Sequence, residues 1–443
     1  YTVKCLTVLK PCSPAKKRRA LNVQIFYVFI IHFLCYLTLY LNYKKKEIAI
    51  FYVAQMIVAI VYMVSYHGIY KNSSRLITNN MTFLLLIGFV MLTRIDFSLA
   101  KRQFIFATIA LVVTAFIPKV VVNVKRLKYL NVFYAIFGIG LLATVFVPGL
   151  GISKYGARNW IGIGDFSFQP MELVKIIFVF FVASSLEKSC GFKDMVKTTV
   201  VAFMFVLVLV AEKDLGGAVI FCMIYLMMLY VATQRLSILI CGGGFGALAA
   251  TGGYLLFKDK LGHVTTRINA WLDPFKYIND SGYQVATSLF AIGSGGFVGT
   301  GLCQGAPNAV IVVESDFIFA AICEELGVIF ALCLLLMYLS IFIYFINISM
   351  KIRDPFYKNV AFGFTVCFIF QIFLNVGGVI KFIPSTGVTL PLVSYGVSSI
   401  VSTLIIFGII QGICVMEHGG EENSSEESEN YEQKEYYQDF SGE

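Results

Sequence analysis

The chain carries little charge and few interruptions in its long apolar runs. Asp, Glu, Lys and Arg make up 14% of its 443 residues, hydrophobic residues make up 58%, and the mean hydropathy is +0.79. Water-soluble domains do not carry so much apolar sequence, and core helices do not need runs of this length. This composition excludes a soluble enzyme or binding module. It predicts an all-α fold, a polytopic transmembrane helical bundle.

Other residue types are scarce as well. The four His are scattered, and the 11 Cys include no Cys-x-x-Cys pair, so the sequence predicts neither a zinc site nor a disulfide framework. Basic residues outnumber acidic ones and give a formal net charge of +9. Lys and Arg lie mostly in short loops between apolar runs, as in cytoplasmic loops of membrane proteins. We therefore expect a membrane partner and no nucleic-acid partner.

Twelve apolar runs are about long enough to cross a hydrocarbon core of roughly 30 Å. They are 23–42, 48–70, 81–97, 103–122, 130–148, 170–187, 197–211, 215–233, 236–257, 316–349, 359–382 and 391–415. The run 316–349 must tilt or extend past the bilayer. Three parts are expected: residues 1–80, a cytoplasmic segment with two extra transmembrane helices; residues 81–415, a ten-helix core; and residues 416–443, an acidic, disordered cytoplasmic tail.

Lys and Arg also set the expected orientation. The positive-inside rule places most of the basic loops in the cytoplasm, with Lys44 to Lys46 as an exception. Residues 148–168 and 258–315 then form outer loops. The second is much longer than a helix connection requires, which is typical of a functional loop. Its stretch 283–292 is amphipathic and is expected to lie along the membrane surface.

Two carboxylates, Glu172 and Asp316, are predicted at the outer-side beginnings of apolar helices. An ionisable group in that position is costly unless it faces a partner, water or a substrate. Each could simply cap a helix N-terminus, which contributes about 0.3–1 kcal/mol, and Asp316 after Ser315 suits such a cap. Alternatively, the helix terminus keeps the carboxylate ionised, so that it can accept a proton as a base.

Further polar residues accompany these carboxylates. Lys175 shares a helical face with Glu172, so it either forms an ion pair that makes Glu172 tolerable in the membrane or faces an anionic phosphate. Glu324 shares the face of Asp316 and either bonds a neighbouring helix or lines a cavity. Small and polar residues at 384–387 and 391–396 interrupt the last helical pair and predict a cavity wall.

The glycine-rich run 293–301 imitates a phosphate-binding loop. No strand–helix–strand unit surrounds it, and it falls on the outer side of the membrane, where ATP is absent. We therefore expect no nucleotide site there. A tight, flexible outer loop is the expected structure.

With these residues the chain resembles the SEDS family of bacterial membrane proteins, which includes rod-shape, cell-division and sporulation members. The resemblance covers roughly residues 81–415 and is specific because so many motifs occur in one order. The motifs are Gly156-Ala157 with Trp160, Gln169-Pro170 with Glu172 and Lys175, Asp214-Leu215-Gly216, Asp273-Pro274, Gly282-Tyr283-Gln284, Ile292-Gly293-Ser294-Gly295-Gly296, Asp316-Phe317-Ile318-Phe319, Glu324-Glu325-Leu326-Gly327 and Pro391-Leu392-Val393-Ser394-Tyr395-Gly396.

The resemblance implies a multi-pass peptidoglycan glycosyltransferase of the bacterial cytoplasmic membrane, with its active site facing outward. It would polymerise lipid II into undecaprenyl-linked glycan beside a class B penicillin-binding transpeptidase. The implied catalytic residues are Asp316 and Glu172. The implied substrate-binding residues are Lys175, Arg102, Arg267, Trp160, Arg158, Glu324, Ser394 and Tyr395.

The chemistry suits these residues. Asp316 would deprotonate the acceptor hydroxyl, which attacks the anomeric carbon and expels a lipid pyrophosphate. Basic side chains, or a Mg²⁺ or Mn²⁺ ion held by Glu172 and Asp316, would stabilise the departing charge. Such a reaction requires no nucleotide.

Three positions depart from the family pattern. Val397 replaces a second glycine, while Asn159 and Ser167 replace basic residues, which predicts weaker binding of an anionic substrate. Two other functions suit the same residues: a flippase or transporter of the lipid-linked precursor, and a non-enzymatic scaffold of the division or elongation machinery. A polymerase requires Asp316 for turnover, a flippase moves lipid without making polymer, and a scaffold tolerates Asp316→Asn.

Overall fold

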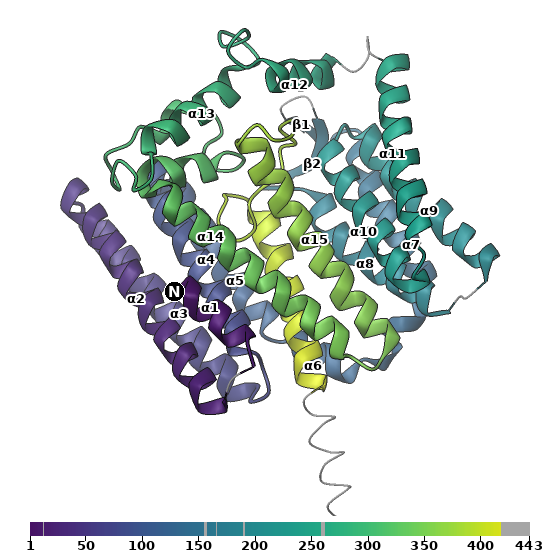
Figure 1. Ribbon diagram of the computed structural model, residues 1–443, viewed down its shortest axis with the longest axis horizontal. Helices are drawn as coiled ribbons and strands as arrows, with labels where there is room; N and C mark the ends of the chain where they lie inside the picture. Colours follow the sequence, from purple (N-terminus) through teal and green to yellow (C-terminus); the bar gives the residue numbers. More distant parts are fainter. Residues whose placement is uncertain (12, 155–156, 165, 189–190, 258–261, 418–443) are drawn as a thin grey trace, which may run out of the picture.

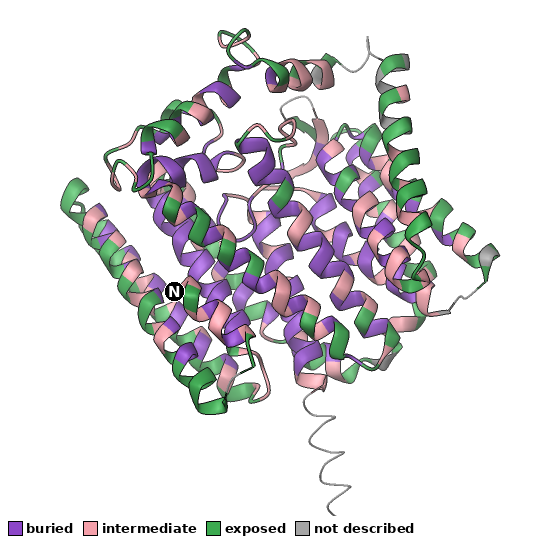
Figure 2. Cartoon of the chain, viewed as in Figure 1, coloured by how far each residue is buried: buried purple, intermediate pink, exposed green. Residues whose placement is uncertain are grey.

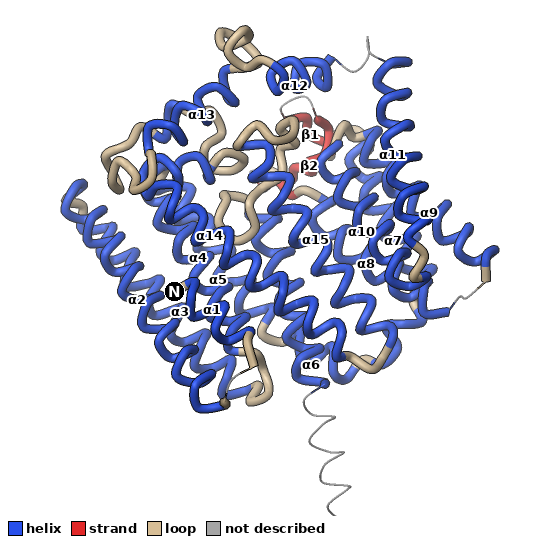
Figure 3. Tube along the Cα trace, in the orientation of Figure 1, coloured by secondary structure: helices blue, strands red, loops and turns tan. Residues whose placement is uncertain are grey.

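The computed structural model describes residues 1–443 except 12, 155–156, 165, 189–190, 258–261 and 418–443. Long helices lie side by side, and α12 (Gly262–Leu272) and α13 (Tyr283–Gly295) gather at one end of them (Figure 1). A small sheet lies at this same end (Figure 3). The acidic tail predicted for 416–443 lies almost entirely outside the described residues.

Each of the twelve predicted runs is helical. The helices are α2 (Pro14–Tyr43), α3 (Lys46–Ile69), α4 (Arg75–Ile95), α5 with α6 (Phe97–Thr114 and Ile117–Asn123), α7 (Asn131–Ala143), α8 (Pro170–Lys188), α9 (Phe192–Ala211), α10 (Leu215–Thr233), α11 (Leu236–Phe257), α14 (Ile318–Lys351), α15 (Pro355–Val379) and the C-terminal helix (Val397–Glu417). Within the described part of the chain, 9 helices are long and apolar enough to cross a membrane. The other three are α7, α8 and α11.

The centre of the bundle is α4, which is buried on every side from residue 76 to residue 93. A helix that is apolar all round belongs in such a position. The burial pattern in Figure 2 agrees, since buried residues fill the middle of the bundle and exposed residues follow the outer faces of α2 and α11. In a membrane these outer apolar faces contact lipid.

The N-terminal pair α2 and α3 packs against α4 through polar contacts as well as apolar ones. His32 bonds Gln55 at 3.0 Å, Gln55 donates to the hydroxyl of Tyr36 at 2.6 Å, and that hydroxyl lies 2.9 Å from Thr93 Oγ1. Buried polar groups need such partners in hydrocarbon. A preceding short helix, α1 (Thr2–Leu9), lies against α2 and α14.

The outer loop predicted for 148–168 contains a three-stranded antiparallel sheet, which the sequence reading did not anticipate. Its strands are β1 (Gly151–Lys154), β2 (Ala157–Ile163) and β3 (Phe166–Phe168), in that spatial order. Ile152 pairs with Trp160, and Gly162 pairs with Ser167. The backbone N–H of Arg158 donates to the carbonyl of Glu212 at 3.0 Å, so the sheet is attached to the turn between α9 and α10.

The run 316–349 is not one continuous membrane helix. α14 is broken at Gly327, whose φ of 84° and ψ of 161° are not helical. The break leaves backbone groups unpaired on both sides, and the glycine-rich run supplies their partners. Thr300 and Gly301 donate to the carbonyls of Glu324 and Glu325, and Val328 and Ile329 donate to the carbonyls of Gly296 and Phe297.

Two glycines of the run 293–301, Gly295 and Gly299, are therefore packing residues. A Cβ added at Gly295 would overlap the backbone of Cys323, and one added at Gly299 would overlap the backbone of Glu325. Only glycine allows two backbones to approach so closely. The expected flexible loop is instead a segment fixed by backbone hydrogen bonds to the broken helix.

Candidate active site

Asp316 lines a small hollow at the end of the bundle that carries α12 and α13. The hollow lies between the beginning of α14, the end of α15 and the loop that follows α15. It is lined by Asp316, Phe317, Leu374, Asn375, Gly378, Val379, Ser385, Thr386, Gly387 and Val388. The structure thus places residues 385–387 of the predicted stretch 384–387 in a cavity wall, whereas residues 391–396, predicted as part of the same wall, do not line this hollow.

Asp316 does not cap α14. The N-cap position is Phe317, which has no side-chain cap hydrogen bond, and Asp316 Oδ1 instead accepts a hydrogen bond from Ser315 Oγ at 3.0 Å. The backbone carbonyl of Asp316 accepts from Asn375 Nδ2 at 2.9 Å. The carboxylate is therefore held at the hollow and does not cap the beginning of α14. This geometry disfavours the capping interpretation.

Arg267 is brought to Asp316 by α12, although 49 residues separate them in the chain. A Cβ placed on Gly387 would lie 3.6 Å from Asp316 Oδ2 and 3.7 Å from Arg267 Nη2, so both side chains border the same space. Trp271, one helical turn after Arg267, donates to the carbonyl of Lys381 at 3.2 Å and fixes α12 over this loop. Gly387 has a φ of +74°, a left-handed backbone conformation that favours glycine.

Electrostatics favour a proton acceptor at Asp316, which precedes the membrane-spanning part of α14. Burial raises the pKa of the Asp316 carboxyl above its ordinary value, and Glu314 adds to this effect. The Ser315 hydroxyl and the charge of Arg267 act in the opposite direction. A raised pKa makes the ionised carboxylate a stronger base.

Glu172 and Lys175 lie in a different environment, a closed network inside the bundle. They are 4% and 1% exposed. Glu172 Oε2 accepts from Lys175 Nζ at 2.5 Å and from Ser402 Oγ at 2.6 Å, and Lys175 also donates to Gln371 Oε1 at 3.0 Å. Of the two interpretations that the sequence allows for Lys175, this geometry favours the ion pair that makes Glu172 tolerable.

The residues predicted around Trp160 belong to the sheet. Asn159, which replaces a basic residue, donates to Asp214 Oδ2 at 2.9 Å, and Gln169 donates to the same oxygen at 3.1 Å. Asp214 also caps α10 by accepting from the N–H of Gly217 at 2.8 Å. A basic residue at position 159 would therefore face Asp214, so its absence does not remove a positive charge from the Asp316 hollow.

Glu212 is a buried carboxylate that the sequence reading did not single out. It is fully buried beside Asp214, and neither of its side-chain oxygens has a hydrogen-bond partner among the described residues. Burial, with a smaller contribution from Asp214, raises the pKa of Glu212 to about 9. The side chain is therefore neutral at pH 7, which is how an unpaired carboxyl is tolerated inside a protein.

Glu324 faces the glycine-rich segment and not the Asp316 hollow. Its Oε1 accepts from the N–H of Ala306 at 2.9 Å. Its neighbour Glu325 forms an ion pair with Arg94 at 2.8 Å. Arg94 also donates to the carbonyl of Gly305 at 2.9 Å and to the hydroxyl of Tyr43, at the end of α2, at 3.0 Å. Glu324 therefore bonds the chain near Ala306 through Oε1, and its Oε2 is buried without a hydrogen-bond partner among the described residues.

The remaining predicted residues divide into one that is buried and two that are accessible. Ser394 is 2% exposed, accepts from the N–H of Leu390 and donates to the carbonyl of Ser315, so it supports the segment before Asp316. Tyr395 is partly exposed, and its neighbour Arg102 is exposed near the beginning of α5. Arg102 therefore remains accessible to an anionic ligand.

The residues do not form an evident metal centre. No group of three or more His, Cys, Asp or Glu side chains converges in the part of the chain that the structure describes. The expected joint ligands, Glu172 and Asp316, have different partners, and the Glu172 oxygen already accepts from an ammonium group. A cation placed beside Lys175 would be repelled. This donor set does not fit a Mg²⁺ or Mn²⁺ ion bound by both carboxylates.

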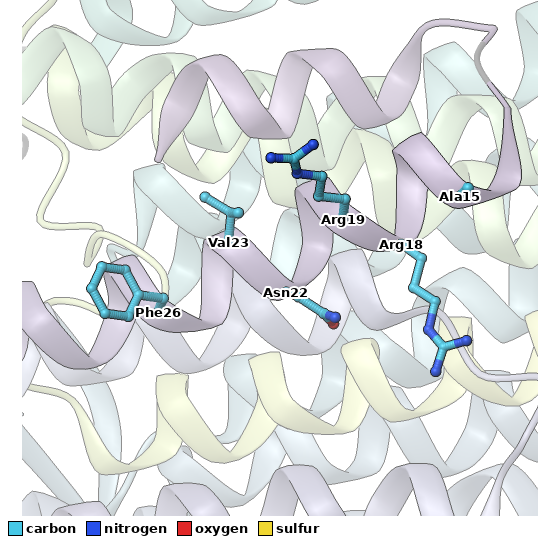
Figure 4. Close-up of a pocket in the computed structure, with 6 residues that line it drawn as sticks. All are labelled: Ala15, Arg18, Arg19, Asn22, Val23 and Phe26. Carbon is cyan, nitrogen blue, oxygen red and sulfur yellow. The ribbon is translucent and has the colours of Figure 1, made fainter.

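Another hollow lies on α2, at the opposite end of the bundle from α12 and α13 (Figure 1). Its lining residues are Ala15, Arg18, Arg19, Asn22, Val23 and Phe26 (Figure 4). All six come from one helix, and Figure 4 shows Arg18 and Arg19 pointing in different directions. Side chains that diverge from a single helix do not enclose a ligand. We therefore assign the active site to the smaller hollow at Asp316.

Comparison with known proteins gives one family. The family model for FtsW, RodA and SpoVE, described as cell cycle protein, matches residues 74–418. The peptidoglycan glycosyltransferase RodA of Mycobacterium bovis is 30% identical over 354 residues, which cover 74% of this chain and 75% of that protein. The stage V sporulation protein E of Bacillus subtilis is 32% identical over 325 residues, which cover 72% of this chain and 87% of that protein.

A solved structure supports the same fold. A chain of a peptidoglycan synthase complex, described as coordinating polymerization and crosslinking, superposes with a TM-score of 0.64 and 24% sequence identity. The match covers 77% of the present chain and 97% of that chain. At this level of identity the likeness concerns the fold alone. The matched family region begins at residue 74, after the N-terminal pair α2 and α3.

Proposed function

Because this chain belongs to the family of FtsW, RodA and SpoVE, we propose that it is a peptidoglycan glycosyltransferase that polymerises lipid II into glycan strands. Curated relatives that it resembles carry this activity in their names. The observation that supports the proposal within this chain is the hollow at Asp316, where a partly buried carboxylate borders the same space as Arg267. Elongation, division and sporulation are the processes that such an activity serves.

Asp316 is the proposed general base. It takes the proton from the acceptor sugar hydroxyl as the hydroxyl oxygen bonds to the anomeric carbon of the growing chain. The bond from that carbon to the pyrophosphate oxygen breaks, and the electron pair leaves with the lipid pyrophosphate. Arg267, and Arg102 at the neighbouring helix end, stabilise the departing negative charge. No step is assigned to a metal ion, because the donor set does not fit one.

The Glu172–Lys175 pair has a supporting part in this mechanism. Gln371 and Asn375 lie four residues apart on α15, so they share a face and are separated by about 6 Å along the helix axis. Gln371 accepts from Lys175, and Asn375 donates to the backbone of Asp316. The buried network therefore holds α15 in place, and α15 in turn holds the segment that carries the base.

The active site is proposed to face outward. The loops that contain Lys125 to Lys128, Lys188 to Lys197 and Lys351 to Lys358 all follow or precede helix ends opposite to Asp316. Such a bias places those loops in the cytoplasm. The turn at Lys44 to Lys46 remains the exception, since Tyr43 meets Arg94 at the Asp316 end.

A membrane-anchored class B transpeptidase is the proposed partner. The likeness to a chain from a peptidoglycan synthase complex supports this assignment. Glycan strands made on the outer face require crosslinking, and a transpeptidase beside the polymerase receives them directly.

The test is polymerisation of lipid II by the purified full chain, alone and with its candidate transpeptidase. Wild type should form polymer, and Asp316→Asn should bind lipid II without forming polymer. Transfer of lipid II between leaflets without polymer would identify a flippase. Normal support of growth by Asp316→Asn in cells would identify a scaffold, and either result would overturn the proposal.

A further inference from the structure

Two buried polar atoms beside Asp316 have no hydrogen-bond partner among the residues that the structure describes. They are Oδ1 of Asn375 and Oγ1 of Thr386. Both residues line the same hollow as Asp316. A buried polar atom without a partner costs about 1–3 kcal/mol, so two of them in one small hollow call for an explanation.

The orientation of the Asn375 amide is fixed by its neighbours. Its Nδ2 donates to the carbonyl of Asp316 at 2.9 Å and to the carbonyl of Val388 at 2.7 Å. Carbonyl oxygens accept hydrogen bonds and do not donate them, so the amide cannot be reversed without loss of both bonds. Asn375 is 4% exposed, and its side-chain oxygen is an acceptor without a donor among the described residues.

The chemistry of these atoms selects a class of ligand. An amide oxygen accepts only, a threonine hydroxyl accepts or donates, and an ionised Asp316 accepts. The three together suit a group rich in O–H or N–H, such as a sugar ring with hydroxyl and amide substituents. They do not suit a phosphate, whose oxygens would be repelled by Asp316 and could not donate to Asn375.

The size of the hollow limits what can enter it. Its volume is about 10 Å³, roughly the space that one water-sized group requires and far below the roughly 300–1,000 Å³ of complete small-molecule pockets. It can therefore receive a single hydroxyl or amide group of a sugar, while the rest of a lipid-linked substrate stays outside. A group that enters can donate a hydrogen bond to these polar atoms.

We propose that Asn375 and Thr386 form, with Asp316, the subsite for the acceptor sugar, in which they accept hydrogen bonds from its hydroxyl or amide groups. This inference rests on the proposed glycosyltransferase function and adds the residues that distinguish the acceptor. Arg267, which borders the same space at Gly387, is left for the anionic leaving group. The subsite therefore separates the acceptor hydroxyl from the pyrophosphate that leaves the donor.

Thr386→Val gives a direct test, because it removes the hydroxyl and keeps the shape of the side chain. Loss of one hydrogen bond to substrate should raise the KM for lipid II about three- to tenfold with little change in kcat. Removal of an unpartnered hydroxyl should leave the thermal unfolding temperature unchanged or raise it. Thr386→Ser keeps the hydroxyl and should retain the wild-type KM.

A matched control is available at Ser184 on α8. Its hydroxyl is also buried without a partner, but it does not line the hollow. Ser184→Ala should leave the KM unchanged. Asn375 is less suitable for substitution, because its amide also holds two carbonyl groups.

The inference fails if Thr386→Val keeps the wild-type KM, or if it unfolds at a clearly lower temperature, since the hydroxyl would then have a structural partner. Lipid II binding by Asp316→Asn, with and without Thr386→Val, separates this result from the proposed function. If wild type makes no polymer, the binding assay still decides the subsite: weaker binding with Thr386→Val supports it, and equal or absent binding overturns it.

Discussion

The two candidate catalytic carboxylates, Glu172 and Asp316, lie near one face of α15 and have opposite surroundings. Next to Gln371, Glu172 is bonded to Lys175 and Ser402 inside the bundle. One turn further, Asn375 meets the backbone of Asp316, whose carboxylate has the Ser315 hydroxyl as its hydrogen-bonded side-chain partner and borders a hollow with two unpartnered polar atoms.

This difference indicates which carboxylate is available for chemistry. A buried charge with its partners in place is a packing element, because its ion pair and hydrogen bonds compensate part of the desolvation cost. Polar atoms without partners around a second carboxylate can form hydrogen bonds to a ligand. Predictions that separate the two sites follow, from the largest expected effect to the smallest.

Asp316→Asn should lower the polymerisation rate by about 10²–10⁴-fold, because general-base catalysis contributes about that much. Its thermal unfolding temperature should stay close to that of wild type, because the carboxylate holds no neighbouring helix. Lipid II polymerisation and thermal unfolding in the same detergent measure both. A large loss of stability in this variant would mean that Asp316 is a packing element like Glu172.

Glu172→Gln should act mainly on stability. It leaves the Lys175 ammonium buried without its counter-ion, and breaking a buried ion pair costs about 3–5 kcal/mol. The double variant Glu172→Gln with Lys175→Met should recover most of the lost unfolding temperature, since neither charge remains. If the double variant does not recover the unfolding temperature, Glu172 and Lys175 stabilise the protein through other contacts and not through their ion pair.

Gly387→Ala should have an intermediate effect. A non-glycine residue at a φ of +74° costs about 1–2 kcal/mol. The added methyl group would also occupy the space between Asp316 and Arg267, so polymerisation should fall more than stability does. Gly293→Ala is the matched control, because a Cβ there has nothing within 4 Å. Equal activity in the two variants would place the reaction elsewhere.

The smallest effect is a shift in pH dependence. Burial raises the pKa of Asp316 and Arg267 lowers it. The rate should therefore rise with pH as Asp316 ionises, and in Arg267→Gln this rise should move to higher pH, while Arg267→Lys should keep it near its original position. Stability has the opposite sign: a folded-state pKa above the unfolded one makes stability fall as pH rises through that interval. A pH–rate profile that is the same in Arg267→Gln and wild type would contradict the assignment.

Sequence patterns predicted the elements that depend on local composition. Apolar runs predicted the twelve helices, and the carboxylate at 316 and the polar residues at 385–387 were predicted to be near a cavity. The pairing of residues 296–301 with the break at Gly327 was not predictable, because it joins backbone atoms and leaves no pattern in the side chains. The sheet at 151–168 was missed because its strands are short and one of their anchors, Asp214, is distant in the chain.

Asn375 shows a different limit of prediction from sequence. It lies within an apolar run, although Gln371 and Asn375 are two amide side chains spaced four residues apart, which places them on one helical face. That spacing is a usable signal for a polar face inside a membrane bundle. Spacing alone could not show that the Asn375 oxygen has no partner among the described residues, whereas Lys175 and Glu172 bond each other and further side chains.

The backbone crossing at Gly327 also determines which substitutions this region can accept during evolution. Phe297 and Val298 are 77% and 80% exposed, and Phe297 takes part in the pairing through its backbone carbonyl, so both side chains can change with the surroundings. Gly295, Gly299 and Gly327 have no such freedom, because any side chain would enter the opposite backbone. In a collection of viable variants, tolerant and intolerant positions should therefore alternate within a few residues of each other, next to the helix that carries the base.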